Sequence, residues 1–204
     1  MSVDSLQNEI ISLLAAREGH FKLESGHHGS VWLDLDSLFL RPNALQRFAV
    51  ELANRLSPHK VEAVCGPLTG GAFLAELVAS QLDVQFYYTE RIQDPQGDAL
   101  YSAQYKLPKA LREKIRGMAV AIVDDAIHAG SAVRSTIADL EACRARPVAL
   151  GALLVLGPFI SDYAADRRMP LEYIGRLPGA FWIPSACPLC ASGIPLEHVP
   201  TSGR

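Results

Sequence analysis

The sequence is short of cysteine and lacks any long apolar run. Only four of its 204 residues are cysteines, and in a reducing compartment we expect them to be free thiols. No window reaches the roughly 18 uncharged apolar residues that a membrane span requires; the longest run, residues 147–159, is predicted to be a buried strand. The N-terminus has no basic region typical of a secretory signal. We therefore expect a cytoplasmic protein with no membrane partner.

An excess of positive charge is also lacking. The formal net charge is −3, which argues against nucleic acid as the main partner, because phosphate backbones are bound by clustered cations. Hydrophobic residues make up 49% of the chain, so there is enough apolar material for a core and no case for global disorder. The length fits one domain with small additions.

From residue 61 onward, short apolar strands alternate with helices. Strands are predicted at 61–65, 84–88, 118–123 and 148–156, and helices at 72–82 and 131–143. This alternation predicts an α/β fold, a Rossmann-like parallel sheet flanked by helices on both faces. Polar turns follow Cys65, Tyr88 and Val123, so they would meet at the carboxyl edge of the sheet, where such folds bind ligands.

The two ends of the chain follow other patterns. The apolar spacing predicts a helix over residues 5–17 that Gly19 stops, and another that begins at Pro42 and closes at residues 57–58. Between them, two short strands at 21–23 and 31–35 flank a turn at Ser25 and Gly26. The last 45 residues are rich in proline and glycine and show only weak strand signals, at 171–174 and 180–183.

The strongest candidate site begins where the strand 118–123 ends. Asp124 and Asp125 follow this strand, then comes a turn of small residues, and a helix begins near Ser131. Backbone amides and a helix N-terminus can bind phosphate there, while the two carboxylates can accept hydrogen bonds from a sugar diol. An ordinary strand–turn–helix with an aspartate cap is the alternative, but the whole pattern over 122–132 favours phosphate.

Two further segments would lie at the same edge. The turn 66–71 holds three glycines, which permit close approach to an anion, although a tight βα turn alone also requires glycine. The stretch 89–117 is too long for an idle connection and is basic toward its end, with Lys106 and Lys109 among its cations. It can act as a lid over a polyanion; a solvated charged surface, with a short helix over 109–116, is the alternative.

The segment 122–132 resembles the signature of the type I phosphoribosyltransferases. The segment Phe21–Gly26 is similar to the hood segment of orotate phosphoribosyltransferases. The strand 84–91 and the tail 187–196 are similar to the corresponding segments of the bacterial members of that group. The resemblance therefore covers about residues 19–200. It implies a small hood formed by the N-terminal segment. The organisation expected from it is an N-terminal helix and hood (1–40), an α/β core (41–160) and a C-terminal extension packed on them (161–204), in one structural unit.

The resemblance also implies a role for each candidate residue. Asp124 and Asp125 would hold the ribose hydroxyls, and Arg91 would face the pyrophosphate. Ser25 and Gly26 would contact the base. The remaining residues would bind the phosphoribosyl pyrophosphate: Ala126, Ile127, His128, Ala129, Gly130, Ser131, Ala132, Leu68, Thr69, Gly70, Lys106 and Lys109.

The activity implied is Mg²⁺-dependent transfer of phosphoribose from 5-phosphoribosyl-1-pyrophosphate to orotate, which yields orotidine 5′-monophosphate and pyrophosphate. The cation would bind mainly through the substrate, and the enzyme would be a homodimer. The chain departs from the family pattern at three places. Glu24 stands where many members have lysine, and His128 stands where threonine is usual. The turn 66–71 has no lysine or arginine, which many members carry there. An enzyme for another base, or a weakly catalytic donor-binding regulator, are the alternatives.

The pair Cys187 and Cys190 has the spacing of half a zinc site. A structural site needs four ligands, and His198 is the only further candidate nearby in the sequence. The sequence therefore predicts free thiols and no protein-held metal. His27 and His28 are expected in the hood or at the surface, and Trp32 and Trp182 as packing residues.

Overall fold

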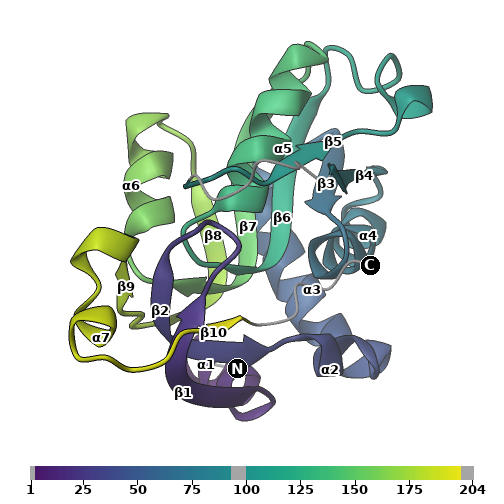
Figure 1. Cartoon of the computed structure of the whole chain (residues 1–204). Helices are drawn as coiled ribbons and strands as arrows, with labels where there is room; N and C mark the ends of the chain where they lie inside the picture. Colours follow the sequence, from purple (N-terminus) through teal and green to yellow (C-terminus); the bar gives the residue numbers. More distant parts are fainter. Residues whose placement is uncertain (1–2, 93–99, 199–204) are drawn as a thin grey trace.

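Two sheets form the framework of the computed structural model, which describes residues 3–92 and 100–198 (Figure 1). The larger has the order β5-β4-β3-β6-β7-β8, and the smaller, here called the hood sheet, has the order β10-β1-β2-β9. The strands of the larger sheet are β3 (Ala63–Pro67), β4 (Gln85–Ile92), β5 (Gln104–Lys106), β6 (Ala119–Ile127), β7 (Arg146–Leu156) and β8 (Leu171–Leu177). Those of the hood sheet are β1 (Ala15–Lys22), β2 (His28–Asp34), β9 (Phe181–Trp182) and β10 (Glu197–His198).

The larger sheet is parallel except for β5, which pairs antiparallel with β4. The helices are α1 (Val3–Ser12), α2 (Asp36–Phe39), α3 (Pro42–Leu56), α4 (Gly70–Leu82), α5 (Ser131–Ala142), α6 (Phe159–Asp166) and α7 (Pro188–Ala191). The expected α/β class, with helices on both faces of a mostly parallel sheet, is confirmed. No helix in the described part of the chain is long and apolar enough to cross a membrane.

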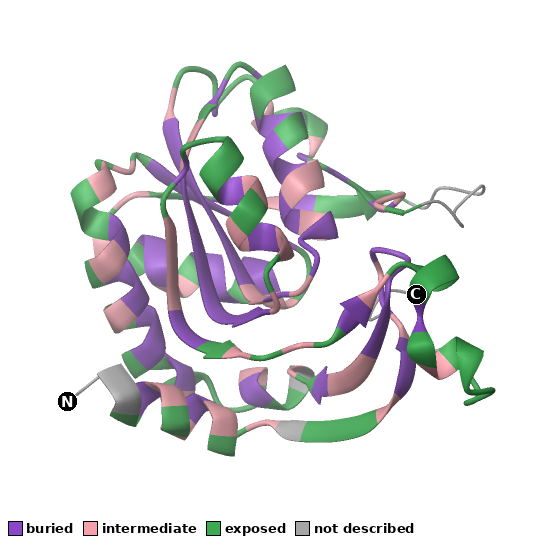
Figure 2. Cartoon of the chain, turned by 90° about the vertical axis from the view of Figure 1, so that its left-hand side faces the viewer, coloured by how far each residue is buried: buried purple, intermediate pink, exposed green. Residues whose placement is uncertain are grey.

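Alternation along the central strands divides the core into two layers. In β6, Ala121 and Val123 belong to the apolar cluster that contains α3 and α4, whereas Val120 and Ile122 belong to the cluster that contains α5. All four side chains are fully buried, as expected for a strand covered on both faces. Figure 2 shows these central strands as the buried interior between exposed outer faces. The carboxyl end of β6 is therefore held rigidly from two sides.

The N-terminal part differs from the sequence prediction. Helix α1 ends at Ser12, and the expected helical residues up to Arg17 are in strand β1 instead. Gly19 does not stop a helix; it lies inside β1, where a Cβ would approach Cζ of Phe21 to 2.7 Å. Pairing with β2 along almost the whole strand outweighs the local helical spacing.

The C-terminal part contributes to both sheets. Strand β8 is the edge strand of the larger sheet, so the core extends to Leu177 and not to the expected boundary at residue 160. Strands β9 and β10 of the expected C-terminal extension pair with β1 and β2, so the extension adds two strands to the hood sheet. The charged stretch 109–116 forms a 3₁₀ turn, Lys109–Leu111, followed by turns and not the alternative short helix.

The core prediction is tested by truncating a buried leucine of α3. Leu52 is fully buried under the larger sheet, whereas Leu40 is 82% exposed. We expect Leu52→Ala to lower the free energy of unfolding by about 2–5 kcal/mol, because it removes buried methyl groups and leaves a cavity. Leu40→Ala, the matched control, should change it by less than about 0.5 kcal/mol. Urea denaturation measures both; equal effects would contradict the core assignment.

Candidate active site

A cavity of about 500 Å³ lies between the carboxyl edge of the larger sheet and the hood sheet. Three turns contribute most of its lining: the β3–α4 turn, the β6–α5 turn and the β1–β2 turn of the hood. The size is in the range of small-molecule sites. The position agrees with the rule that open α/β sheets bind ligands beyond the carboxyl ends of their strands.

The β6–α5 turn presents two acidic residues and a row of backbone amides. The amide of Asp125 donates to Oδ1 of Asp124 at 3.1 Å, and the amide of Ala126 donates to Oδ1 of Asp125 at 2.8 Å. Gly130 closes the turn with φ of 81°, a conformation that favours glycine, and α5 begins at the next residue. The helix N-terminus therefore faces the cavity with its partial positive charge.

Two polar atoms of this turn are buried without a hydrogen-bond partner. They are Nε2 of His128 and Oγ of Ser131, which belong to the small set of such side-chain atoms among the described residues. A buried polar group without a partner costs about 1–3 kcal/mol. Because both residues line the cavity, a polar ligand held by the turn would satisfy them.

His128 is a neutral imidazole at neutral pH. Burial lowers the pKa of His128 from 6.5 to about 4, since the charged ring loses its hydration. Its ring packs edge-on against Phe181 of β9, with the ring centroids 5.7 Å apart. A neutral imidazole can donate one hydrogen bond, so the residue can take the place of the hydroxyl that the family resemblance implies there.

The β3–α4 turn lies directly against the two carboxylates. A Cβ on Gly70 would be 2.0 Å from Oδ2 of Asp125, and a Cβ on Gly71 would be 2.6 Å from Oδ1 of Asp124. Only glycine can occupy these positions without displacing an acid. The amide of Leu68 donates to the carbonyl of Thr89 in β4 at 2.9 Å, and the Leu68–Thr69 peptide is cis.

The two carboxylates lie close enough to affect each other's ionisation. Burial raises the pKa of Asp124 well above its usual range, and the nearby charge of Asp125 raises it further. Hydroxyl donors or a cation placed against the pair would favour the ionised form. The pair thus has the properties of a binding site for a sugar diol or a hydrated cation.

Glu24 of the hood is paired and does not leave a bare negative charge. Its Oε1 accepts a hydrogen bond from the Tyr105 hydroxyl at 2.7 Å and lies 3.5 Å from Nε of Arg91. Burial, followed by the charge of Glu24, raises the pKa of Tyr105 above its usual range. These contacts join the hood to β4 and β5 across the cavity.

Most residues predicted for the site line this one cavity. They are Ser25, Leu68, Thr69, Gly70, Arg91, Asp124, Asp125, Ala126, Ile127, His128, Ala129, Gly130, Ser131 and Ala132. Among the described residues, Gly26, Lys106 and Lys109 do not line it. Gly26 forms the turn with φ of 79°. Lys106 follows Tyr105 in β5, and the alternation of side chains directs it away from the face where Tyr105 meets the cavity.

The expected lid, 89–117, is partly visible. Residues 93–99 lie outside the described residues. The amide of Tyr101 donates to the carbonyl of Ser25 at 2.9 Å, which brings the returning strand onto the hood. Asp139 of α5 holds the other end, since it accepts from the amide of Leu107 at 2.8 Å and pairs with Arg112.

The lining residues that sequence reasoning missed include Arg17, Trp32 and Asp34 of the hood hairpin. Trp32 was expected only to pack. Arg17 and Trp32 are directly opposed in the β1–β2 ladder, and Asp34 is two residues further on the same side of β2. Only the pairing register of the β1–β2 hairpin could have placed these three residues at the cavity. The incorrect prediction of a helix over 5–17 prevented that register from being recognised.

Comparisons with known proteins agree with this geometry. Residues 36–188 match the family "Phosphoribosyl transferase domain". An orotate phosphoribosyltransferase of Thermotoga maritima is 32% identical over 93% of this chain and 94% of its own. Two solved structures share the fold. An orotate phosphoribosyltransferase from Aeropyrum pernix has a TM-score of 0.59 and 20% sequence identity, and the match covers 86% of this chain and 94% of that one. An adenine phosphoribosyltransferase from Thermoanaerobacter pseudethanolicus has a TM-score of 0.64 and 16% identity, and the match covers 83% of this chain and 99% of that one.

The state of His128 is tested by the pH dependence of stability. The folded pKa near 4 lies below the ordinary value of 6.5, so only the unfolded chain takes up this proton between those pH values. This contribution, up to about 3 kcal/mol, is present above pH 6.5 and is lost as the pH falls toward 4. We expect the difference in unfolding free energy between wild type and His128→Asn to shrink over that window. A constant difference would contradict the depressed pKa.

Proposed function

Because the chain belongs to the phosphoribosyltransferase family, we propose that it transfers phosphoribose from 5-phosphoribosyl-1-pyrophosphate to orotate. The observation that carries the proposal is the β6–α5 turn, where two acids and two unpartnered polar atoms face one cavity. The name of the Thermotoga maritima relative, which covers nearly the whole chain, supports orotate as the acceptor. The products are orotidine 5′-monophosphate and pyrophosphate.

The β6–α5 turn binds the sugar phosphate in this proposal. The amides of residues 128–132 and the hydroxyl of Ser131 hold the 5-phosphate at the N-terminus of α5, where the helix dipole favours an anion. Nε2 of His128 provides a further donor. Asp124 and Asp125 accept hydrogen bonds from the two ribose hydroxyls. These contacts would satisfy Nε2 of His128 and Oγ of Ser131, the two buried atoms of this turn that have no hydrogen-bond partner within the chain.

The β3–α4 turn and Arg91 receive the pyrophosphate. Leu68, Thr69 and Gly70 line the cavity beside the acids, and their turn can present backbone amides to an anion. The turn itself has no cation. Arg91 lines the same cavity, where its guanidinium lies against Glu24. On donor binding, Arg91 can turn from this carboxylate to the leaving group and balance its charge.

The donor set at the carboxylate pair suits Mg²⁺. Carboxylate oxygens, together with phosphate oxygens of a substrate, are the ligands that this cation prefers, and it retains several waters. Burial and the neighbouring charge of Asp125 raise the pKa of Asp124, so a cation bound beside the two carboxylates would favour their ionised form. Bound with the donor, Mg²⁺ would neutralise developing charge on the pyrophosphate.

The protein acts mainly by positioning. A ring nitrogen of orotate, which is acidic enough to react as an anion, forms the new bond to C1 while the bond from C1 to the pyrophosphate oxygen breaks. The transition state has oxocarbenium character, as in other glycosyl transfers. The two turns hold the sugar and the leaving group in line, and the hood covers the acceptor side of the cavity.

The hood supplies the contacts to the base. Ser25 lines the cavity, and Gly26 shapes the turn that presents it. Glu24 stands where related enzymes commonly have lysine. Tyr105 and Arg91 bind its carboxylate, so its negative charge is partly offset and repels an anionic base less. The same residue is the observation that favours the second candidate, an enzyme of this fold for a different base.

We place Lys106 and Lys109 in the pocket of a neighbouring subunit. Both are exposed and lie outside the cavity of their own chain. In a homodimer, the segment that carries them can extend over the partner's site and neutralise the pyrophosphate there. Sedimentation equilibrium should therefore report a dimer.

The acceptor is identified by a panel of bases. The protein is incubated with 5-phosphoribosyl-1-pyrophosphate, Mg²⁺ and orotate, uracil, adenine or hypoxanthine, and pyrophosphate release is followed. We expect release with orotate alone. Turnover of another base would establish the second candidate, and tight donor binding without turnover would indicate a regulator that has retained only the donor site.

The diol assignment is tested with Asp125→Asn. Each hydrogen bond to a charged group is worth about 1.5–3 kcal/mol, so we expect the donor dissociation constant to rise roughly ten- to a hundred-fold. Asp162→Asn, which changes an exposed acid in the first turn of α6, is the matched control and should leave the constant unchanged. Calorimetric titration measures both. Unchanged affinity in Asp125→Asn, with the fold intact by circular dichroism, would exclude the assignment.

A further inference from the structure

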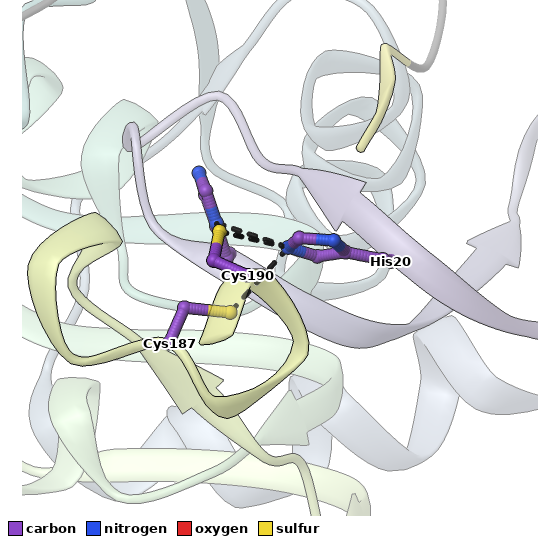
Figure 3. A group of neighbouring side chains, drawn as sticks. His20, Cys187 and Cys190 are labelled. Atoms are coloured by element: carbon purple, nitrogen blue, oxygen red, sulfur yellow. Dashed lines mark hydrogen bonds between the residues drawn. The ribbon is translucent and has the colours of Figure 1, made fainter. Parts of the chain in front are cut away.

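Four potential metal ligands converge on one point at the outer end of the hood. This Cys–His cluster consists of His20, His28, Cys187 and Cys190. One nitrogen or sulfur atom of each residue lies within 4.8 Å of the corresponding atoms of all the others. Three of the four residues are buried, and Cys190 is exposed. Figure 3 shows the two cysteines pointing toward the ring of His20.

Four of the six distances within the Cys–His cluster are known and lie close to the edges of a tetrahedral site. Nε2 of His20 lies 3.0 Å from Nδ1 of His28, and Sγ of Cys187 lies 3.4 Å from Nε2 of His20. Sγ of Cys190 lies 3.6 Å and 3.2 Å from the same two nitrogens. Zinc bonds to nitrogen and sulfur in a tetrahedron require edges of about 3.3–3.8 Å. Small shifts of the side chains would therefore suffice to accept an ion.

Several potential donors crowd around one acceptor atom in the Cys–His cluster. Nδ1 of His20 lies 2.8 Å from the carbonyl oxygen of Ile194, which can only accept, so Nδ1 carries the proton. In the neutral ring, Nε2 then has one lone pair, yet three potential donors surround it. A cation can bind all four ligand atoms at once. A metal-binding histidine usually donates its other N–H to a carbonyl in this way.

The backbone around the two cysteines forms a chelating turn. Cys187 immediately precedes the short helix α7. After this helix, the amide of Gly193 donates a hydrogen bond to the carbonyl of Cys190 at 3.0 Å, and Gly193 has a φ of 69°. Two cysteines separated by two residues are typical of structural zinc sites. Two thiolates and two neutral imidazoles would also balance the charge of a divalent ion, which favours burial.

We propose that the Cys–His cluster binds one Zn²⁺ ion that joins the hood strands to the C-terminal segment. Mixed nitrogen and sulfur ligands in a tetrahedron select zinc over magnesium or calcium. His20 lies two residues before the end of β1, and His28 begins β2, so the ion would lie beside the hairpin that presents Ser25 to the cavity. In this proposal Cys187 and Cys190 are zinc ligands, whereas the sequence alone predicts free thiols. The side chain of His198 is outside the described residues.

Metal content is the direct test. The full chain is purified without an affinity tag that binds metal, dialysed, and analysed by inductively coupled plasma mass spectrometry. We expect about one zinc per chain in the wild type and almost none in Cys190→Ser or His28→Ala. Cys143→Ser changes a buried cysteine outside the cluster and should retain the full equivalent. Zinc retained by the cluster variants, or absent from wild type after refolding with Zn²⁺, would overturn the proposal.

A second measurement on the wild type does not depend on how the variants fold. Replacing zinc with Co²⁺ should produce visible bands of tetrahedral cobalt with thiolate-to-metal charge transfer, and a strong chelator should lower Tm by roughly 5–10 °C. A disulfide between Cys187 and Cys190 in the purified protein, with no cobalt spectrum after reduction, would contradict the site. Both readouts need no substrate, so failure of the orotate assay would leave them valid.

Discussion

The close approach of two turns at the carboxyl edge of the larger sheet is the constraint on which the site depends. Gly70 and Gly71 lie so close to the carboxylates of Asp125 and Asp124 that a single Cβ would meet an oxygen at 2.0 Å or 2.6 Å. The strands behind both turns are buried on both faces, so neither turn can retreat without disturbing the core. The acids are thereby held close to each other and beside a row of backbone amides.

The hood converts this edge into a closed pocket, and its stability depends on both ends of the chain. Strands β1 and β2 come from the N-terminal part, whereas β9, β10 and the turn with the two cysteines come from the last 18 residues of the described chain, 181–198. Such a small sheet has little core of its own. A metal ion beside the β1–β2 hairpin would supply the missing rigidity, and the contacts of Glu24 with Tyr105 and Arg91 join the hood to the core from the other side.

Local sequence was sufficient for the parts of the site that are contiguous. The segment from Asp124 to Ser131 was predicted because strand, turn and helix follow one another and each has a clear pattern. The hood was harder, since β1 has the apolar spacing of a helix at its start and becomes a strand through pairing with β2. His20 and Cys187 are 167 residues apart, so no local pattern could bring them together. Lys106 and Lys109 were assigned to the pocket from the charge of their segment and from the family resemblance, but both are exposed and lie outside the pocket of their own chain.

The central claim is that the β6–α5 turn binds the sugar phosphate between the two acids and the N-terminus of α5. A crystal structure of the protein with 5-phosphoribosyl-1-pyrophosphate and Mg²⁺ tests it most directly. The account predicts the 5-phosphate within hydrogen-bond distance of the amides of residues 128–132 and of the Ser131 hydroxyl, with the ribose hydroxyls on Asp124 and Asp125. A donor molecule bound elsewhere, with His128 and Ser131 still lacking partners, would contradict it.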